Sequence, residues 1–267
     1  MHTFSDVGLR DVQAVYSGPE RELWELVMGQ QIHIGGLKSS MELAELAAIR
    51  SGTEGVDLCC CTGAGMRFLV RFRRVEQMVG VDATEAVLSL GRTRSQSEGL
   101  ADRITFVLAD ACASGLPDAG FDFVWGEDAW CYVADKDRLV AEAARLARPG
   151  GVIAFTDWIE GPAGLGPSEA TRWLRFMKFP SIASQQEYVA LLESNGCRIV
   201  AAEDTGRFAP YVDLYLNLFN MQFSYDALRL LGFDASLMHA VAEEMEFMRE
   251  LAHAGKIAQG RFVARKP

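Results

Sequence analysis

Short apolar runs alternate with amphipathic stretches along most of this chain. The runs are GVDLCC, MVGVD, RITFVLAD, FDFVW and VIAFTDW, and a stretch with apolar residues at helical spacing or a turn separates each from the next. A short apolar run indicates a buried strand, and a period of 3.6 residues indicates a helix. Strands that alternate with helices in this way predict βαβ units and a mostly parallel sheet.

Boundary signals support two of the helices. LKSSMELAELAAIR is expected to begin with a capping box of Ser39 and Glu42, and SQQEYVALLESNG with one of Ser184 and Glu187. The latter leads into CRIVAAED, a predicted sixth strand. After about fifty mainly helical residues, KIAQGRFVARK predicts the last strand.

No repeat, low-complexity tract or linker divides the chain, so we expect a single domain over residues 1–267. Within it, the stretch YVDLYLNLFNMQFSYDALRLLGF has an apolar face, which favours either the core of a helical cap or the contact surface of a homodimer. Four polar residues interrupt that face, which argues against a membrane role there: Asp213, Asn217, Asn220 and Asp226.

Composition narrows the class of partner. The chain has 267 residues, is 49% hydrophobic and carries a formal net charge of −10, which is unlike a protein that binds nucleic acid through its phosphates. A small-molecule or cationic partner fits better. No signal segment is visible and no apolar run approaches the ~18 residues that span a bilayer, so we expect a cytoplasmic protein without a membrane segment.

Three of the six cysteines are consecutive, Cys59 to Cys61, directly after the first predicted strand. A reducing compartment argues against disulfides. No C-x-x-C or C-x-x-H pair is present, and alternate side chains of a strand point to opposite faces, so we expect no metal site. The simplest interpretation is that these thiols act as small buried apolar groups.

Polar groups gather where the predicted parallel strands end. The first strand ends in the turn CTGAG, and the next four run into Asp82, Asp110, Glu127-Asp128 and Asp157-Trp158. Ligands of such sheets bind beyond the carboxyl ends of the strands. An acid that closes the second strand suits the two hydroxyls of a ribose, and a turn of small residues lets the backbone approach a nucleoside.

These segments resemble the motifs of the class I S-adenosylmethionine-dependent methyltransferases. VDLCCCTGAG is similar to their first motif, acid-x-Gly-x-Gly-x-Gly; GVD is similar to their ribose-binding acid, VLADA to their adenine segment and LARPGG to the turn before their fifth strand. The resemblance implies a Rossmann-like, doubly wound sheet of seven strands with an antiparallel last strand and a helical cap. It also implies S-adenosylmethionine as methyl donor and S-adenosylhomocysteine as product. The cofactor-binding residues that it implies are Asp57, Cys59, Cys61, Gly63, Asp82, Ala83, Asp110, Ala111 and Glu127.

The chain departs from that motif at its first two glycines, which are replaced by Cys59 and Cys61. A β-carbon at these positions crowds the donor unless the backbone keeps a negative φ and the thiols point aside. Because a thiol is a small group, we expect donor binding to survive.

Looser similarities point to the small-molecule N-methyltransferases of the sarcosine/dimethylglycine and phosphoethanolamine type. By this resemblance residues 1–36 are a lid, 37–160 the cofactor-binding core, and 161–267 substrate-side helices with the last two strands. A methyl acceptor that becomes a quaternary ammonium is held well by aromatic faces. The expected catalytic residues are His33, Glu127, Asp128 and Trp130. The expected substrate-binding residues are Tyr16, Trp130, Tyr132, Asp157 and Trp158.

Each of these roles has a structural alternative. Trp130 and Trp158 can roof the core, Glu127 and Asp128 can cap a short helix, and Asp157 can orient loop backbone. His33 can be a structural hydrogen-bonding residue, and Tyr16 a packing residue. Gly35-Gly36 is either a hinge of the lid or an ordinary turn.

The sequence favours transfer of a methyl group from S-adenosylmethionine to the nitrogen of a small amine or amino acid. O- or C-methylation of a small metabolite is the alternative on the same scaffold. A nucleotide-binding oxidoreductase is disfavoured because G-x-G-x-x-G is absent. A non-catalytic sensor stays open, since a fold does not dictate a function.

Overall fold

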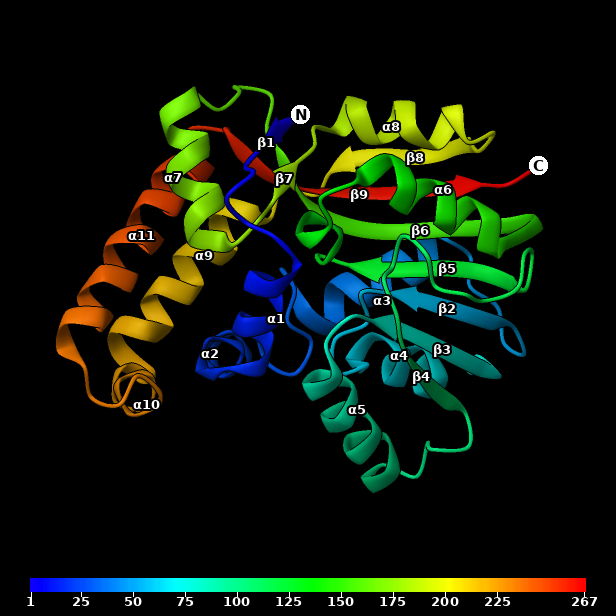
Figure 1. The fold of residues 1–267 in the computed structure, drawn as a ribbon, viewed down its shortest axis with the longest axis horizontal. Helices are drawn as coiled ribbons and strands as arrows, with labels where there is room; N and C mark the ends of the chain where they lie inside the picture. The colour runs from blue at the N-terminus through cyan, green and yellow to red at the C-terminus, as the bar shows by residue number, and fades with distance from the viewer.

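Seven strands form one sheet in the computed structural model, which describes all residues 1–267 (Figure 1). Their order is β4-β3-β2-β5-β6-β9-β8; the pairs from β4 to β6 are parallel, and β9 is antiparallel to both of its neighbours. The predicted doubly wound sheet with an antiparallel last strand is confirmed. The strands are β2 (Glu54–Leu58), β3 (Gln77–Asp82), β4 (Ile104–Leu108), β5 (Phe121–Glu127), β6 (Ala147–Glu160), β8 (Arg198–Asp204) and β9 (Ile257–Arg265).

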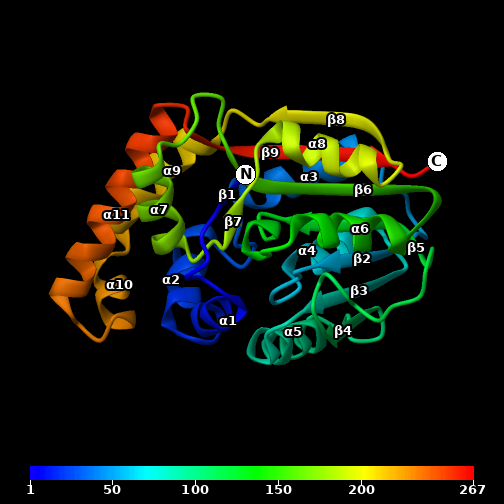
Figure 2. The ribbon, with the colours of Figure 1, turned by 45° about the horizontal axis from the view of Figure 1, so that its top comes forward.

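Helices cover both faces of this sheet (Figures 1 and 2). On one face, α6 (Lys136–Leu146) and α8 (Gln185–Ser194) bury apolar side chains such as Leu139 and Leu192. On the other face lie α3 (Gly36–Leu46), α4 (Ala64–Phe68) with the π-helical turn η1 (Leu69–Arg73), and α5 (Glu85–Ser97). Burial on both faces explains why the parallel strands are almost continuously apolar.

The remaining helices form a cap beside the sheet, at the left of Figure 1. They are α7 (Pro167–Met177), α9 (Phe208–Asn217) with η3 (Leu218–Gln222), α10 (Ser224–Leu230) and α11 (Ala235–His253). Val212, Tyr215 and Phe219 are buried in the cap, so the apolar stretch that begins at Tyr211 contributes cap core. None of the helices combines the length and the apolar run needed to cross a lipid bilayer.

The N-terminal helices α1 (Leu9–Ser17) and α2 (Pro19–Met28) lie between the cap and the sheet (Figure 1). A short strand before them, β1 (His2–Thr3), pairs with β7 (Ser181–Ile182). We call residues 1–36 the lid segment.

One of the two predicted capping boxes is confirmed. The amide of Ser184 donates to Glu187 Oε2 at 2.7 Å, and the amide of Glu187 donates to Ser184 Oγ at 3.3 Å. The box of Ser39 and Glu42 is wrong, because α3 begins one turn earlier: Gly35, at φ +90°, is its N-cap. Ser39 is therefore inside the helix with an unbonded hydroxyl, and Glu42 pairs with Arg207 and Arg261.

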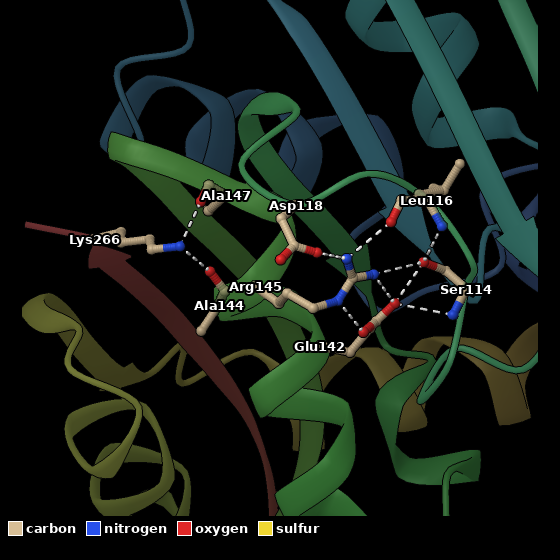
Figure 3. Close-up of polar contacts among 8 residues, drawn as sticks. All are labelled: Ser114, Leu116, Asp118, Glu142, Ala144, Arg145, Ala147 and Lys266. Atoms are coloured by element: carbon tan, nitrogen blue, oxygen red, sulfur yellow. Dashed lines mark hydrogen bonds and ion pairs between the residues drawn. The ribbon is translucent and has the colours of Figure 1, made fainter.

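A polar network closes the edge of the sheet where α6 ends (Figure 3). Arg145 donates to both oxygens of Glu142 at 2.7 and 2.8 Å and to the carbonyl of Leu116 at 2.8 Å, and it pairs with Asp118. The hydrogen bonds from Arg145 lower the pKa of Glu142 to about 2. The network fixes the loop between β4 and β5 at the edge opposite the strand ends that carry the predicted site.

Candidate functional site

A cavity of about 260 Å³ lies at the carboxyl ends of β2, β3, β4 and β5, under the lid segment. Of the predicted cofactor-binding residues, all except Gly63 line it, together with the predicted His33, Asp128, Tyr16 and Tyr132. Gly63 lies just behind the wall, as the N-cap of α4 with φ +72°. The structure therefore brings residues from five separate segments to one cavity.

The cysteine loop takes the backbone conformation of the glycines it replaces. Cys59 has a φ of +64° and Cys61 a φ of +49°, both in the left-handed region that favours glycine. The negative φ named above as the condition for avoiding crowding is therefore not met, and the survival of donor binding stays a prediction. All three cysteines contribute to the cavity lining; Cys59 and Cys61 are half-buried, and Cys60 is buried and packs in the core on the other face of the sheet.

The loop is held by hydrogen bonds to β3. The amide of Cys59 donates to the carbonyl of Val81 at 2.8 Å, and that of Cys61 to Asp82 Oδ2 at 3.0 Å. No group of three or more His, Cys, Asp or Glu side chains is arranged to hold a metal ion. Burial raises the pKa of the Cys61 thiol to about 12, so this thiol is protonated at neutral pH and is a poor nucleophile.

The left-handed backbone of Cys59 and Cys61 predicts that replacement of either residue by glycine stabilises the fold. A non-glycine residue in this region costs about 1–2 kcal/mol, so Cys59→Gly and Cys61→Gly should each raise the free energy of unfolding, by about 1 kcal/mol after the entropic cost of glycine. Cys60→Gly is the matched control: its φ is not positive and its buried thiol packs in the core, so we expect it to destabilise the fold. Urea unfolding of the three variants checks this order. Destabilisation by all three would contradict it.

Asp82 holds the loop and also faces the cavity. Its Oδ2 accepts the amide of Cys61, and its Oδ1 accepts the amide of Thr84 at 2.9 Å. Burial raises the pKa of Asp82, and the hydrogen bonds from these amides partly oppose that rise. A carboxylate has about four acceptor positions, so the two amides leave capacity for a ligand.

Gly65 brings the first turn of α4 against two carboxylates. A β-carbon on Gly65 would lie 2.8 Å from Glu127 Oε2 and 3.5 Å from Asp57 Oδ2. Asp57 is 4% exposed and makes no hydrogen bond through its side chain. Burial, with the negative charges of Glu127 and Asp82, raises the pKa of Asp57 well above its ordinary value. This part of the cavity favours a cation.

The raised pKa of Asp57 predicts that this residue lowers the free energy of unfolding in a pH-dependent way. An acid with a raised pKa in the folded state keeps its proton longer when folded, so the free energy of unfolding falls as pH rises from the unfolded pKa toward the folded one. Relative to wild type, Asp57→Asn should therefore gain stability as pH rises above about 4. Urea unfolding at several pH values measures the difference, with the exposed Asp102→Asn as control. A difference that does not change with pH would contradict the assignment.

His33 lies in a buried network on the opposite wall. Its Nε2 is 3.2 Å from Ser40 Oγ and 3.4 Å from Glu127 Oε1, while Ser40 donates to Glu127 Oε1 at 2.6 Å. Gln31 donates to Ser40 Oγ at 2.9 Å. The network fixes the orientation of the Glu127 carboxylate, whose second oxygen faces Gly65.

Asp128 holds the backbone of the lid segment. Its Oδ2 accepts the amide of Ile34 at 2.8 Å, and both of its oxygens accept the side-chain amide of Gln259. Asp128 is 5% exposed and has a φ of +50°. These contacts favour a positioning role over a catalytic one, and Asp128 does not cap the short 3₁₀ helix η2 (Trp130–Tyr132) with its side chain.

Two tyrosines of the cavity lining are in contact with each other. The ring of Tyr16, from α1, meets that of Tyr132, from η2, edge-on with centroids 5.2 Å apart, and Tyr132 meets Phe179 at 4.8 Å. Burial raises the pKa of both hydroxyls, so each stays protonated at neutral pH. They offer aromatic faces and neutral hydroxyls to a ligand.

Three predicted site residues lie in the core instead. Trp130 is fully buried, stacks on Phe155 at 3.9 Å and does not line the cavity. Trp158 is buried in the cap core. Asp157 is fully buried, where it accepts the amide of Cys131 and the hydroxyl of Tyr188. The predicted catalytic role of Trp130 and substrate contacts of all three are wrong, because their side chains point away from the cavity into packed interior.

Sequence reasoning also missed several contributors: Gln31, Ser40, Gly65 and Gln259. Ser40 and Gln31 belong to segments that were interpreted only as a helix and a lid. Gly65 is the last residue of the motif VDLCCCTGAG, so the motif marks this position, although no role was assigned to it. Gln259 lies in the last strand, far from any motif, and no local pattern marks it.

Comparison with known proteins agrees with this geometry. Residues 56–155 match the family described as "Methyltransferase domain". Over 169 residues the chain is 30% identical to 27-O-demethylrifamycin SV methyltransferase of Amycolatopsis mediterranei (strain S699), covering 62% of this chain and 61% of that protein. It is 27% identical to phosphoethanolamine N-methyltransferase 1 of Arabidopsis thaliana, covering 73% of this chain and 39% of that protein. The chain thus spans less than two thirds of these relatives.

Among solved structures, a putative sarcosine dimethylglycine methyltransferase from Galdieria sulphuraria superposes with a TM-score of 0.84 at 20% identity, over 95% of this chain and 98% of that one. The superposition thus extends over nearly the whole fold. The match over residues 56–155 places a methyltransferase domain in this chain, and the sheet order is that of the class I methyltransferase fold.

Proposed function

We propose that this protein transfers a methyl group from S-adenosylmethionine to a small-molecule acceptor, and that the acceptor atom is the nitrogen of an amine or amino acid. The observation that carries the proposal is the single cavity that unites the cysteine loop, Asp82, Asp110 and the tyrosine pair. The donor supplies an electrophilic methyl group on a sulfonium. The side chains described above bind and orient the donor and the acceptor and exclude water from them.

The residues of the cavity fit this donor. Asp82 keeps acceptor capacity for two ribose hydroxyls after binding two loop amides. Asp57 and Glu127 converge beside Gly65, where only a residue without a β-carbon leaves room, and their charge suits an ammonium group. Asp110 and Ala111 line the part of the cavity that follows β4, where the resemblance puts the adenine.

The charge of the cavity favours a cationic or neutral acceptor. Its lining contains one arginine, Arg138, and six carboxylates: Asp57, Asp82, Asp110, Glu127, Asp128 and Asp135. Asp135 adjoins Cys112, which follows β4, and accepts the backbone amide of Arg138. An amine is attracted to such a lining, whereas a phosphate ester is repelled. We therefore expect simple amines and amino acids to be better acceptors than phosphoethanolamine.

The chain contributes mainly position and desolvation to the transfer. Leu9, Val12 and Tyr16 of α1 cover the cavity, which excludes water. Tyr16 and Tyr132 are placed to hold the acceptor in line with the methyl group, and alignment of this kind supplies most of the rate gain. The attacking amine must be neutral, and the carboxylate of Glu127, fixed by Ser40 and His33, favours the removal of a proton from it.

O-methylation is the second candidate, because the relative from Amycolatopsis is named as the methyltransferase of 27-O-demethylrifamycin SV. A hydroxyl acceptor needs a stronger base than an amine does, and the protonated tyrosines do not provide one.

Incubation of the protein with methyl-labelled S-adenosylmethionine and separate pools of amines, hydroxylated metabolites and phosphate esters tests the proposal. Label is expected in the amine pool, and label confined to hydroxylated metabolites would favour the second candidate. No transfer to any pool, with S-adenosylhomocysteine still bound in calorimetry, would overturn the catalytic proposal and leave a sensor.

A further inference from the structure

We propose that Gln259 is a positioning residue for the reaction: together with Asp128 it forms a clamp that fixes the lid segment and, through it, His33. Only the kinetic measurements described below depend on the proposed function; the hydrogen-exchange measurements do not. We call the pair of Asp128 and Gln259 the peptide clamp.

The clamp binds both polar groups of one residue of the lid segment. Asp128 Oδ2 accepts the amide of Ile34 at 2.8 Å, and Gln259 Nε2 donates to the carbonyl of Ile34 at 3.1 Å. The two clamp residues also bind each other, because Gln259 Nε2 donates to Asp128 at 2.8 and 2.9 Å. The two side chains thereby bind the amide and the carbonyl of Ile34 as a neighbouring β-strand would, although no strand lies next to this residue.

Burial makes these hydrogen bonds hard to replace with water. Ile34 and Gln259 are fully buried, and Asp128 is 5% exposed. The amide of Gln259 has its orientation fixed from behind, because its Oε1 accepts the hydroxyl of Thr205 at 3.0 Å. Loss of the Gln259 amide leaves Asp128 with the amide of Ile34 as its remaining side-chain partner, and leaves the carbonyl of Ile34 with only a 3.4 Å contact to His33 Nδ1.

The position of the clamp connects it to the cavity. Ile34 directly follows His33, whose Nε2 lies 3.2 Å from Ser40 Oγ and 3.4 Å from Glu127 Oε1. A shift of the Ile34 peptide therefore moves the imidazole of His33, whereas Glu127 keeps its hydrogen bond from Ser40. By contrast, the cysteine loop and Asp82 are tied to β3 by their own hydrogen bonds. The clamp thus acts on the lid side of the cavity and leaves the nucleoside side in place.

The variant Gln259→Leu distinguishes an effect on the lid side of the cavity from an effect on its nucleoside side. We expect kcat to fall by ~10–100-fold, the range for a displaced positioning group, while the Kd of S-adenosylhomocysteine in calorimetry changes by less than about threefold. Gln185→Leu is the matched control: it also removes a side-chain amide that donates to a carbonyl, that of Ala202 at 3.0 Å, but far from the cavity. Its kcat should equal that of wild type.

A second variant supplies a pH signature. In Gln259→Glu the new carboxyl meets the carboxylate of Asp128 in a buried site, so the pair retains a proton to a higher pH. When protonated, the new group can donate to Asp128 again. The ratio of variant to wild-type kcat should therefore rise as pH falls, which loss of packing alone does not cause.

Hydrogen exchange tests the clamp without an acceptor. In the ligand-free chain, amides of residues 30–36 should exchange about tenfold or more faster in Gln259→Leu than in wild type, and those of α8 should not change. If Gln259→Leu does not fold, Thr205→Val, which removes only the hydroxyl behind the amide, should show the same pattern to a smaller extent.

Unchanged exchange in residues 30–36, or a lower melting temperature with kcat within about twofold of wild type, would overturn the clamp. Absence of turnover by the wild-type protein would count against the proposed function, and the exchange experiment would still decide whether the clamp exists.

Discussion

Asp82→Asn is expected to weaken the binding of S-adenosylhomocysteine by about 100-fold or more. Hydrogen bonds to a charged group contribute ~1.5–3 kcal/mol each, and asparagine loses both the charge and one of the two acceptor oxygens. Its amide nitrogen also has to face a backbone N–H, of Cys61 or of Thr84, that a carboxylate oxygen accepts in the wild type. Isothermal titration calorimetry measures the change.

Asp122→Asn provides a matched control for that experiment. Asp122 lies in the same sheet, and its Oδ2 also accepts a backbone amide, that of Glu54 at 2.8 Å, but it does not line the cavity. We expect its Kd to match that of wild type. Equal affinity of Asp82→Asn and Asp122→Asn would remove Asp82 from the donor site.

Replacement of both Tyr16 and Tyr132 by leucine is expected to lower kcat/KM for the amine by about 100-fold, with donor affinity little changed. Each aromatic face contributes ~0.5–2 kcal/mol to holding a cation, and the effect of two faces in one transition state approaches the sum. The two rings line the same cavity and meet edge-on.

Phenylalanine at the same two positions distinguishes the rings from the hydroxyls. If the aromatic faces hold the acceptor, the phenylalanine variants retain most of the activity that the leucine variants lose. Tyr225→Leu is the control outside the cavity, since Tyr225 is 67% exposed and forms a similar edge-on pair with Phe233. Full activity of the double leucine variant would exclude an acceptor site against the tyrosine rings.

The order of strands and helices was predictable because each element is encoded locally. Apolar runs such as MVGVD and helical stretches such as SQQEYVALLESNG need no distant contact to be identified. The residues at the nucleoside side of the cavity were predictable for a similar reason. Parallel strands bring their carboxyl ends to one edge of the sheet, whatever the direction of the individual side chains.

The failures concern the direction of side chains and the conformation of single residues. Trp130 follows β5 and Trp158 lies near the end of β6, yet both turn into the core because a large apolar ring gains more by burial. Cys59 and Cys61 take a left-handed conformation because their hydrogen bonds to β3 require that turn, against the preference of the residue type. Similarly, a capping box was expected at Ser39, but two glycines start the helix earlier.

Gln259 illustrates a further limit. Its partners Ile34 and Asp128 are more than one hundred residues away in the chain, and they meet only because the last strand is inserted next to β6. No motif in KIAQGRFVARK indicates that encounter. A contact made by topology alone is visible in the structure and not in the sequence.

A crystal structure of the protein with S-adenosylhomocysteine tests the central claim most directly. The account predicts the nucleoside in the cavity, against the cysteine loop and the carboxyl end of β3, with both ribose hydroxyls within hydrogen-bonding distance of Asp82 and the ammonium group beside Asp57 and Glu127. A ligand bound elsewhere on the chain, with this cavity filled only by solvent, would contradict it.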